Sequence, residues 1–306
     1  MTRNDQFFEQ RSLGIGKWAN LVMGVLGVGA AMLSNSDALM VDGLYSAVNF
    51  VSAVIAGRIA LSVTKGADRK RPFGYDANES IYVTFRSLVL IGILALAFFI
   101  SLDKIIGYIG GGSVPELNFG PIVAYTVVVV AICFSLAAWH HGNWKKTGGR
   151  SDILKTERTA SVVDGILSTG AGGALIGVTF LRGTPLDFIV PISDAIIVVV
   201  LAALMVGEPV RMLVGAVREI AGESVQEETV EKVRGRIRAV LPGACSLLEV
   251  AVTKLGRFYF VVAYLEPEGA VQAREMDDLR ERLQEEYQSL LQPVKSEVVF
   301  TANKPF

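Results

Sequence analysis

Six long apolar stretches dominate this sequence and leave few folds open to it. Each is close to the ~20 residues that a helix needs to cross the hydrocarbon core of a bilayer. Hydrophobic residues make up 51% of the chain, and the mean hydropathy of +0.45 is too high for one soluble core to hide them. We therefore expect an all-α bundle of six transmembrane helices. The stretches cover residues 13–33, 38–61, 81–102, 121–138, 160–181 and 186–206.

Charged residues between the stretches predict the orientation of the bundle. Basic residues gather after the second and fourth stretches, and basic loops stay on the cytoplasmic side of a membrane. Both termini are therefore expected in the cytoplasm, with the chain in the inner (plasma) membrane. The N-terminus shows no signal-peptide pattern, so we expect the first span to be retained. The basic loop residues are Lys65, Arg69, Lys70, Arg71, Lys145, Lys146, Arg150, Lys155 and Arg158.

The last hundred residues are richer in charged residues and show periodic patterns, which predicts a separate small domain. We divide the chain into a transport domain at 1–207 and a cytoplasmic domain at 208–306. Helical periodicity marks 225–240 and 274–291, and alternating patterns mark strands at 247–253, 258–265 and 294–300. This α-β-β-α-β order predicts a small ferredoxin-like α+β domain with its helices on one face of an open sheet.

A domain of that size has a small core, so self-association into a homodimer is expected. Whether the domain senses metal or only sets the dimer geometry is left open, because it contains no histidine for a borderline metal such as zinc. The net charge of −1 gives no support for a nucleic-acid partner. The sequence also shows no nucleophile-and-base pair, zinc motif or phosphate-binding loop, so we do not expect an enzyme.

Asp42 and Asp164 are the chief ionisable residues inside the predicted spans, where such a side chain costs at least about 2.5 kcal/mol. Asp42 shares one helix face with Tyr45, Ser46 and Asn49, and Asp164 shares a face with Ser161 and Ser168. With ~1.5 Å of rise per residue, Asn49 and Ser168 fall level near the membrane centre, about 20 Å deep. The two aspartates flank that level, so a single ion is not expected to touch both. The alternative is that each aspartate is a neutral, hydrogen-bonded packing residue.

The sequences around these aspartates resemble each other. Residues 41–46 read Val-Asp-Gly-Leu-Tyr-Ser and residues 163–168 read Val-Asp-Gly-Ile-Leu-Ser. If the six spans form two sets of three, the halves run in opposite directions, as in many transporters built from inverted repeats. Chance similarity is the alternative. The pattern favours a polar path with one carboxylate towards each side.

Other polar residues in or near the spans are weaker signals. His140 lies near a helix end, where we expect it to reach the headgroups. For Arg86 a structural role and a role in transport are both open. Cys133 is expected to be a small buried hydrophobic residue.

These motifs together resemble the cation diffusion facilitator family of divalent metal cation/proton antiporters. The resemblance rests on the six spans, the Asp-Gly-Leu-Tyr-Ser sequence at 42–46, the Arg-Pro-Phe-Gly-Tyr sequence at 71–75 with Glu79 after it, and the α-β-β-α-β tail. It implies a dimer that exports divalent cations, with protons moving the other way. The resemblance places the metal between the second and fifth spans.

The ligand positions that the resemblance implies hold unusual residues here. They are Tyr45 and Asn49 on the second span, and Leu167 or Ser168 with Ala171 on the fifth. Asp42 and Asp164 lie one turn earlier as substitutes. A second metal site, in the loop after the second span, keeps only Asp68.

The sequence thus predicts export of a divalent cation (Mn, Zn, Fe, Co, Cd or Mg) along Asp42, Tyr45, Asn49, Asp164 and Ser168. Oxygen ligands without His or Cys favour the harder of these ions. Two alternatives stay open at this point. In the first, the same fold carries a monovalent cation; in the second, the chain is a membrane protein whose tail recruits a partner without transport.

Overall fold

The structure is a computed structural model that describes residues 3–63, 68–71, 74–146, 151–243, 245–256, 258–270, 272–291 and 293–305. Pro72 and Phe73 of the loop motif, and Lys65 and Arg150 of the basic loops, lie outside the described residues. The chain divides into two compact units. We call residues 1–57 with 86–210 the bundle unit, and residues 58–85 with 211–306 the sheet unit.

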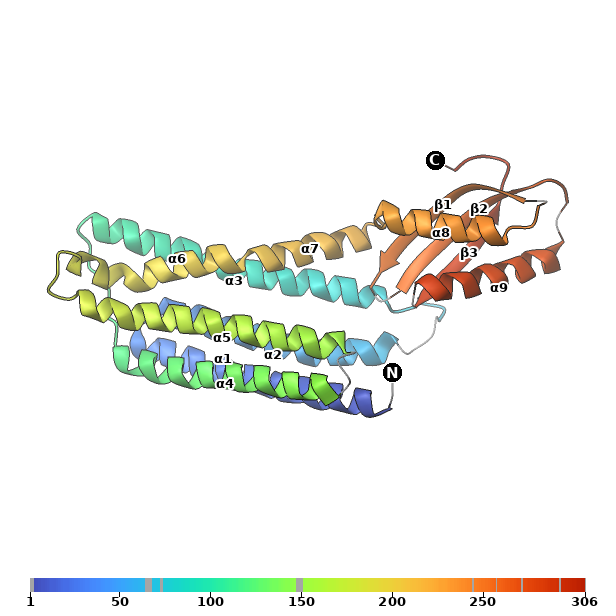
Figure 1. The fold of residues 1–306 in the computed structure, drawn as a ribbon. Helices are drawn as coiled ribbons and strands as arrows, with labels where there is room; N and C mark the ends of the chain where they lie inside the picture. Colours follow the sequence, from blue (N-terminus) through green and yellow to red (C-terminus); the bar gives the residue numbers. More distant parts are fainter. Residues whose placement is uncertain are drawn as a thin grey trace. The chain divides into compact units, whose positions relative to one another are not determined.

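Six helical segments among the described residues are long and apolar enough to cross a membrane, which confirms the predicted number of spans. They cover 8–34, 37–59, 77–109, 119–146, 154–181 and 187–220. The helices are α1 (Arg3–Ser34), α2 (Asp37–Val63), α3 (Ala77–Ile109), α4 (Phe119–Lys146), α5 (Asp152–Val178), the 3-10 turns η1 (Thr179–Leu181) and η2 (Asp187–Ile192), α6 (Ser193–Met205) and α7 (Gly207–Ile220). The last span joins η2, α6 and α7 (Figure 1).

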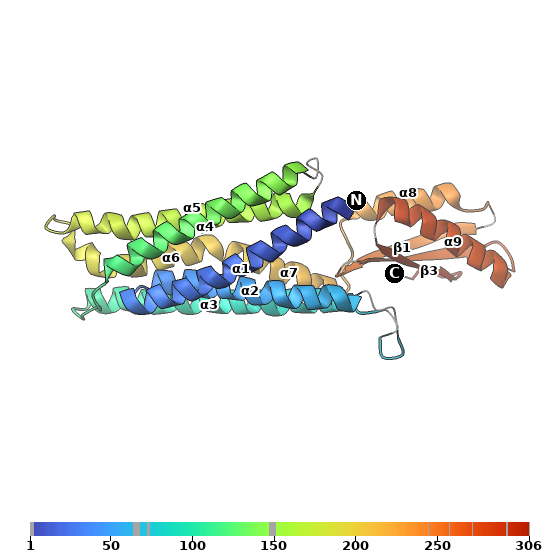
Figure 2. The same cartoon turned by 90° about the horizontal axis from the view of Figure 1, so that it is seen from below.

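Close helix crossings set the positions of the two intramembrane aspartates. α4 packs against α1 and α5, and α5 against α6 (Figure 1 and Figure 2). A Cβ at Gly43 would lie 2.6 Å from the backbone nitrogen of Val28, so only glycine lets α1 and α2 approach this closely. On α5, a Cβ at Gly165 would lie 3.2 Å from Cys133 of α4. Each aspartate thus precedes a glycine at a helix crossing.

The N-terminal part of α1 is joined to α4 by buried polar side chains. His140 is only 1% exposed, and its Nδ1 lies 2.7 Å from the Ser12 hydroxyl oxygen. The Asn143 amide donates to the same hydroxyl at 3.3 Å. The expectation that His140 reaches the headgroups is therefore wrong, because a hydrogen-bonding partner on α1 holds its ring inside the bundle.

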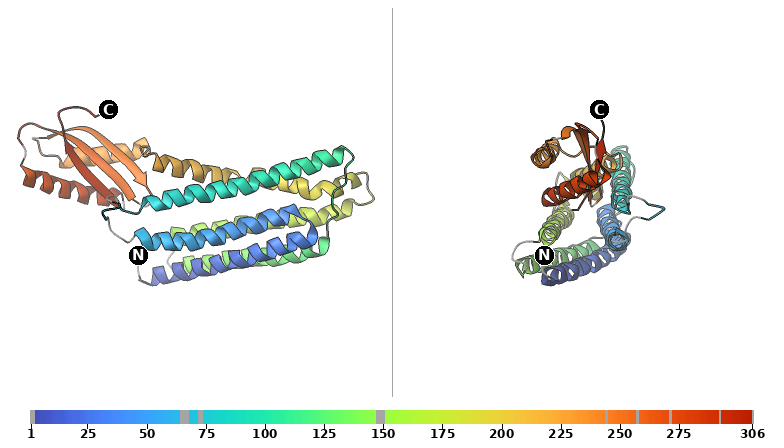
Figure 3. Two further views of the ribbon diagram at one scale, coloured as in Figure 1. Left: turned by 180° about the vertical axis from the view of Figure 1, so that it is seen from behind. Right: turned by 90° about the vertical axis from the view of Figure 1, so that its right-hand side faces the viewer.

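The sheet unit contains the predicted α+β domain, which confirms the α-β-β-α-β order. α8 (Glu227–Val240) precedes β1 (Cys245–Leu255) and β2 (Phe258–Pro267), and α9 (Ala273–Leu290) precedes β3 (Val294–Phe300). The sheet order is β1-β2-β3, with β1 and β2 antiparallel and β2 and β3 parallel. Figure 3 shows both helices on the same side of the sheet, as the sequence predicts.

The core of this domain lies between the helices and that face of the sheet. Alternate residues of β2 point into it, and α8 and α9 each supply one apolar stripe. Its fully buried members include Val233, Ile237, Val252, Val261, Ala263, Leu265, Leu283 and Tyr287.

The β1–β2 turn is held against the ends of two long helices of the same unit. Gly256 has a positive φ of 59°, and a Cβ there would lie 2.2 Å from the carbonyl oxygen of Asp76. Its backbone N–H donates to the Ser80 hydroxyl at 2.9 Å, and that hydroxyl donates to Glu219 at 2.7 Å. Lys254 also donates to Glu219, at 3.0 Å. A glycine at this turn therefore joins the sheet to α3 and α7.

Tyr287 gives a first prediction, because its buried hydroxyl has no hydrogen-bond partner within the part of the chain that the structure describes. Burial also raises the pKa of this hydroxyl. An unsatisfied buried polar group costs about 1–3 kcal/mol, so Tyr287→Phe should raise the free energy of unfolding by about 1 kcal/mol. Thermal melting of the full chain measures this. Leu283→Ala, from the same core, should lower the melting temperature, and a lower value for Tyr287→Phe as well would contradict the prediction.

Candidate ion site in the bundle unit

A small, largely enclosed cavity lies among α1, α2, α4, α5 and α6. Its volume is about 40 Å³. Roughly 10–15 Å³ of such volume holds one water molecule, so the cavity has room for a cation with a small number of waters. Its lining consists of Met23, Ala38, Leu39, Val41, Asp42, Tyr45, Ser46, Asn49, Tyr125, Thr126, Val129, Cys133, Asp164, Leu167, Ser168, Ala171, Gly172, Leu201 and Met205.

All five residues predicted for the membrane path line this one cavity, from α2 and α5: Asp42, Tyr45, Asn49, Asp164 and Ser168. Helical spacing puts the residues of each helix on one face, because positions three, four and seven apart share a face. Asp42 and Asp164 are close enough to interact electrostatically. That an ion binds here stays a prediction. Among the described residues, no three His, Cys, Asp or Glu side chains come together as a metal site.

The Asp42 carboxylate has a partner that the sequence reasoning missed. The Tyr125 hydroxyl of α4 donates to its Oδ2 at 2.6 Å. A bond of this length to a carboxylate is charge-assisted and orients the acid towards the cavity. A cation at Asp42 therefore meets a carboxylate whose position is already fixed.

The cavity also presents sulfur, which the sequence reasoning did not assign to the path. Cys133 is buried, as expected, and its Sγ lies 3.7 Å from Sδ of Met23. Both residues line the cavity wall. Thiol and thioether groups are weak hydrogen-bonding partners, so this wall is softer and less polar than the wall formed by Asp42 and Asn49.

A second, open groove shares the lining residue Asp164 with the cavity. This groove has a volume of about 530 Å³. Asp164 lines both spaces, so it lies between the enclosed cavity and the groove. The groove is lined by Lys155, Thr156, Thr159, Ala160, Val163, Asp164 and Glu208.

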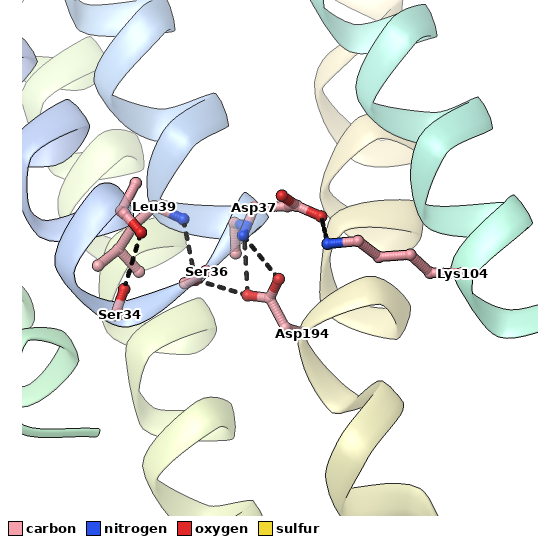
Figure 4. A network of polar contacts seen from close by, with 8 residues as sticks. Ser34, Ser36, Asp37, Leu39, Lys104 and Asp194 are labelled. Carbon is pink, nitrogen blue, oxygen red and sulfur yellow. Dashed lines mark hydrogen bonds and ion pairs between the residues drawn. The ribbon is translucent and has the colours of Figure 1, made fainter. Parts of the chain in front are cut away.

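At the opposite end of the bundle, a hydrogen-bonded network surrounds Asp194 of α6 (Figure 4). The Asp194 carboxylate is only 4% exposed and accepts from the Ser36 hydroxyl at 2.5 Å. It also accepts from the backbone N–H of Asp37 at 2.7 Å and of Ala38 at 3.3 Å. A carboxylate from another helix thus caps the N-terminus of α2, where its charge is favoured.

The network extends to α3 and to the cavity wall. Lys104 of α3 forms an ion pair with Asp37, as Figure 4 shows. The Ser36 hydroxyl accepts from the backbone N–H of Leu39 at 3.3 Å, and Ala38 and Leu39 both line the cavity. α2, α3 and α6 are therefore tied together beside the cavity at the end away from Asp164. An acid in the sixth apolar stretch was the available signal for this network.

Asp68 belongs to the sheet unit, where it lies in a loop. Its Oδ1 accepts from the backbone N–H groups of Lys70 and Arg71, each at 2.8 Å, and its Oδ2 from the Tyr75 hydroxyl at 2.6 Å. The hydrogen bond from Tyr75 lowers the pKa of Asp68. Both carboxylate oxygens therefore serve to close the loop, and Arg71 and Tyr75 of the loop motif help to form that closure.

Comparisons with known proteins agree with the geometry. The family described as "Cation efflux transmembrane domain" matches residues 15–221, about two thirds of the chain. The manganese efflux system protein MneP of Bacillus subtilis is 23% identical over 120 residues, which are 39% of this chain and 39% of that protein. The magnetosome protein MamM of Paramagnetospirillum magneticum is 24% identical over 240 residues, or 76% of this chain and 71% of MamM.

Proposed function

The chain belongs to the cation efflux family, and we propose that it exports divalent metal cations by proton antiport. This is the family of cation diffusion facilitators that its sequence motifs resemble. It is a multi-pass membrane protein. We place it in the inner (plasma) membrane with both termini in the cytoplasm, because the basic loops follow the second and fourth spans. On this proposal it is a transporter and no enzyme, with 1–207 as the transport domain and 208–306 as the cytoplasmic domain of a homodimer.

One observation carries the proposed path: Asp164 lines both the enclosed cavity and the open groove. A cation enters along the groove past Glu208 and exchanges its waters for oxygens at Asp164. It is then held near Asn49 and Ser168 in the cavity. This is the arrangement expected of alternating access in an inward-open state, because the Asp194 network closes the other end.

Release follows from the chemistry of the two carboxylates. A protonated carboxyl group binds a cation poorly, so a proton arriving at Asp42 or Asp164 weakens the site while the bundle opens past Asp42. Asp68, with both oxygens already used, enters the proposal only as a negative charge on the cytoplasmic loop. Oxygen ligands favour harder ions such as manganese or magnesium. MneP, which is similar over 39% of this chain, is a manganese efflux protein.

The test is ion uptake into liposomes that contain the purified protein, with an imposed pH gradient. Manganese, zinc, iron, cobalt, cadmium and magnesium are compared, with protein-free liposomes as the control. Uptake of at least one divalent ion that stops when the gradient is collapsed is the expected result. Uptake that continues after the gradient is collapsed would contradict proton antiport. Uptake of sodium or potassium in place of divalent ions would show that the protein transports monovalent cations. No uptake of any ion would reject transport.

A further inference from the structure

Arg86 is a cationic residue held inside the bundle rather than at its surface. It lies nine positions after Ala77, the first residue of α3, or about 14 Å along the helix axis. An arginine near a helix end ordinarily extends its head to the headgroups. Here Nη2 donates to Oδ1 of Asn49 on α2 at 2.9 Å. Nε is buried and has no hydrogen-bond partner in the described part of the chain.

Asn49 lines the cavity together with Asp164 and Ser168, and its amide oxygen is the atom that a cation would use as a ligand. That oxygen already accepts from Arg86. A metal–oxygen distance is about 2–2.5 Å, so a cation on Oδ1 would lie within about 5 Å of the guanidinium. Two positive charges that close repel each other strongly in a site of low dielectric. Arg86 and a bound cation therefore compete for Asn49.

One carboxylate, that of Glu157, offers the Arg86 guanidinium a second position. It interacts electrostatically with Glu157 of α5 and with Tyr45 of α2. Glu157 lies seven residues, or two helical turns, before Asp164 on the same helix face. A displaced Arg86 side chain can thus turn from Asn49 towards a carboxylate without leaving the bundle.

We propose that Arg86 supplies the positive charge that balances the cavity carboxylates when no metal ion is bound. We further propose that this charge determines the selectivity of the site for divalent ions. This inference rests on the proposed function. The guanidinium holds the Asn49 oxygen and balances the cavity carboxylates until a divalent cation displaces it towards Glu157. A monovalent ion replaces one positive charge by one and gains nothing, whereas a divalent ion adds a charge. Arg86 thereby rejects sodium and potassium from a site that lacks His and Cys among its predicted ligands.

The test is metal binding by the purified full chain, measured by calorimetry with Mn²⁺ and with Na⁺ as competitor. Arg86→Met should bind Mn²⁺ at least 10-fold more tightly than wild type, and Na⁺ should compete at concentrations at least 10-fold lower. Arg86→Lys, which keeps the charge, should stay within 3-fold of wild type. Arg58→Met is the matched control, since Arg58 is exposed on α2. In an Asn49→Ala background most of the gain from Arg86→Met should disappear.

If Arg86 has only a structural role, its replacement should not raise the affinity for Mn²⁺. Arg86→Met would then bind Mn²⁺ with equal or weaker affinity while melting as a folded protein, and that result would overturn the inference. Should Arg86→Met not fold, Arg86→Gln carries the same test, because glutamine can donate to Asn49 without a charge. Mn²⁺ binding by wild type with no gain in either variant rejects this inference alone. Absence of binding of all six divalent ions to wild type rejects the proposed function and this inference with it.

Discussion

Asp164→Asn is expected to reduce metal uptake by roughly 100-fold or more. The substitution keeps the size of the side chain and removes the charge at the junction of the cavity and the groove. Removing one partner of a buried charge pair costs about 3–5 kcal/mol, and each 1.4 kcal/mol is about a factor of ten. The cation in transit is that partner here. Initial uptake rates in the liposome assay measure the loss, and an asparagine cannot take up the coupling proton.

The matched control for this prediction is Asp187→Asn. Asp187 begins η2 and is exposed, so neutralising it should leave uptake within 2-fold of wild type. Asp42→Asn adds a second comparison, because its amide oxygen can still accept from the Tyr125 hydroxyl. It should fold normally yet lose transport through the missing charge. Wild-type uptake by Asp164→Asn would show that the path does not pass this residue.

The spans and the α+β tail could be predicted because they depend on local patterns. Runs of about 20 apolar residues and alternating strands are read from neighbouring residues alone. The Asp-Gly repeats also had a structural meaning. Gly43 lies at the crossing of α1 and α2, and Gly165 at the crossing of α4 and α5. Each aspartate therefore precedes a glycine that packs against the preceding helix, and the relation of the two halves as inverted repeats stays a prediction.

The partners of the site residues could not be predicted, because they lie far apart in the sequence. Tyr125 is 83 positions from Asp42, and Asp194 is 158 positions from Ser36. No periodicity within one helix contains such a pairing, since it depends on which helices become neighbours. Asp194, an acid within the sixth apolar stretch, was a usable signal, because a buried carboxylate requires hydrogen-bond donors. The need for such donors could be predicted from the sequence, but the residues that supply them could not.

The bounds of the helices also differ between the prediction and the structure. α3 begins at Ala77 rather than at residue 81, and α4 continues to Lys146 rather than ending at 138. Hydrophobicity marks only the part of a helix within the hydrocarbon layer, and the polar turns beyond it remain helical. The Asn143–Ser12 contact lies in one of these polar turns, so it was hidden from a prediction based on apolar length.

Asp194→Ala is expected to produce the largest loss of stability among substitutions at the closed end of the bundle. The change leaves the Ser36 hydroxyl and the N–H groups of Asp37 and Ala38 without their acceptor. Each buried unsatisfied group costs about 1–3 kcal/mol, which gives a loss of about 3 kcal/mol or more. The alanine also removes a buried charge, which favours folding. That gain is smaller, because three donors already compensate the carboxylate in the native structure.

Thermal melting of the purified protein in detergent measures this loss, which should lower the melting temperature by roughly 6–12 °C for about 3 kcal/mol. Asp194→Asn keeps one oxygen acceptor and should lose about half as much. Asp103→Ala is the matched control, because Asp103 is exposed on α3 beside Lys104. Equal melting temperatures for Asp194→Ala and Asp103→Ala would show that the network in Figure 4 does not hold the ends of α2 and α6 together. A selective loss at Asp194 would show that this network stabilises the end of the bundle that, on the proposed function, opens for release past Asp42.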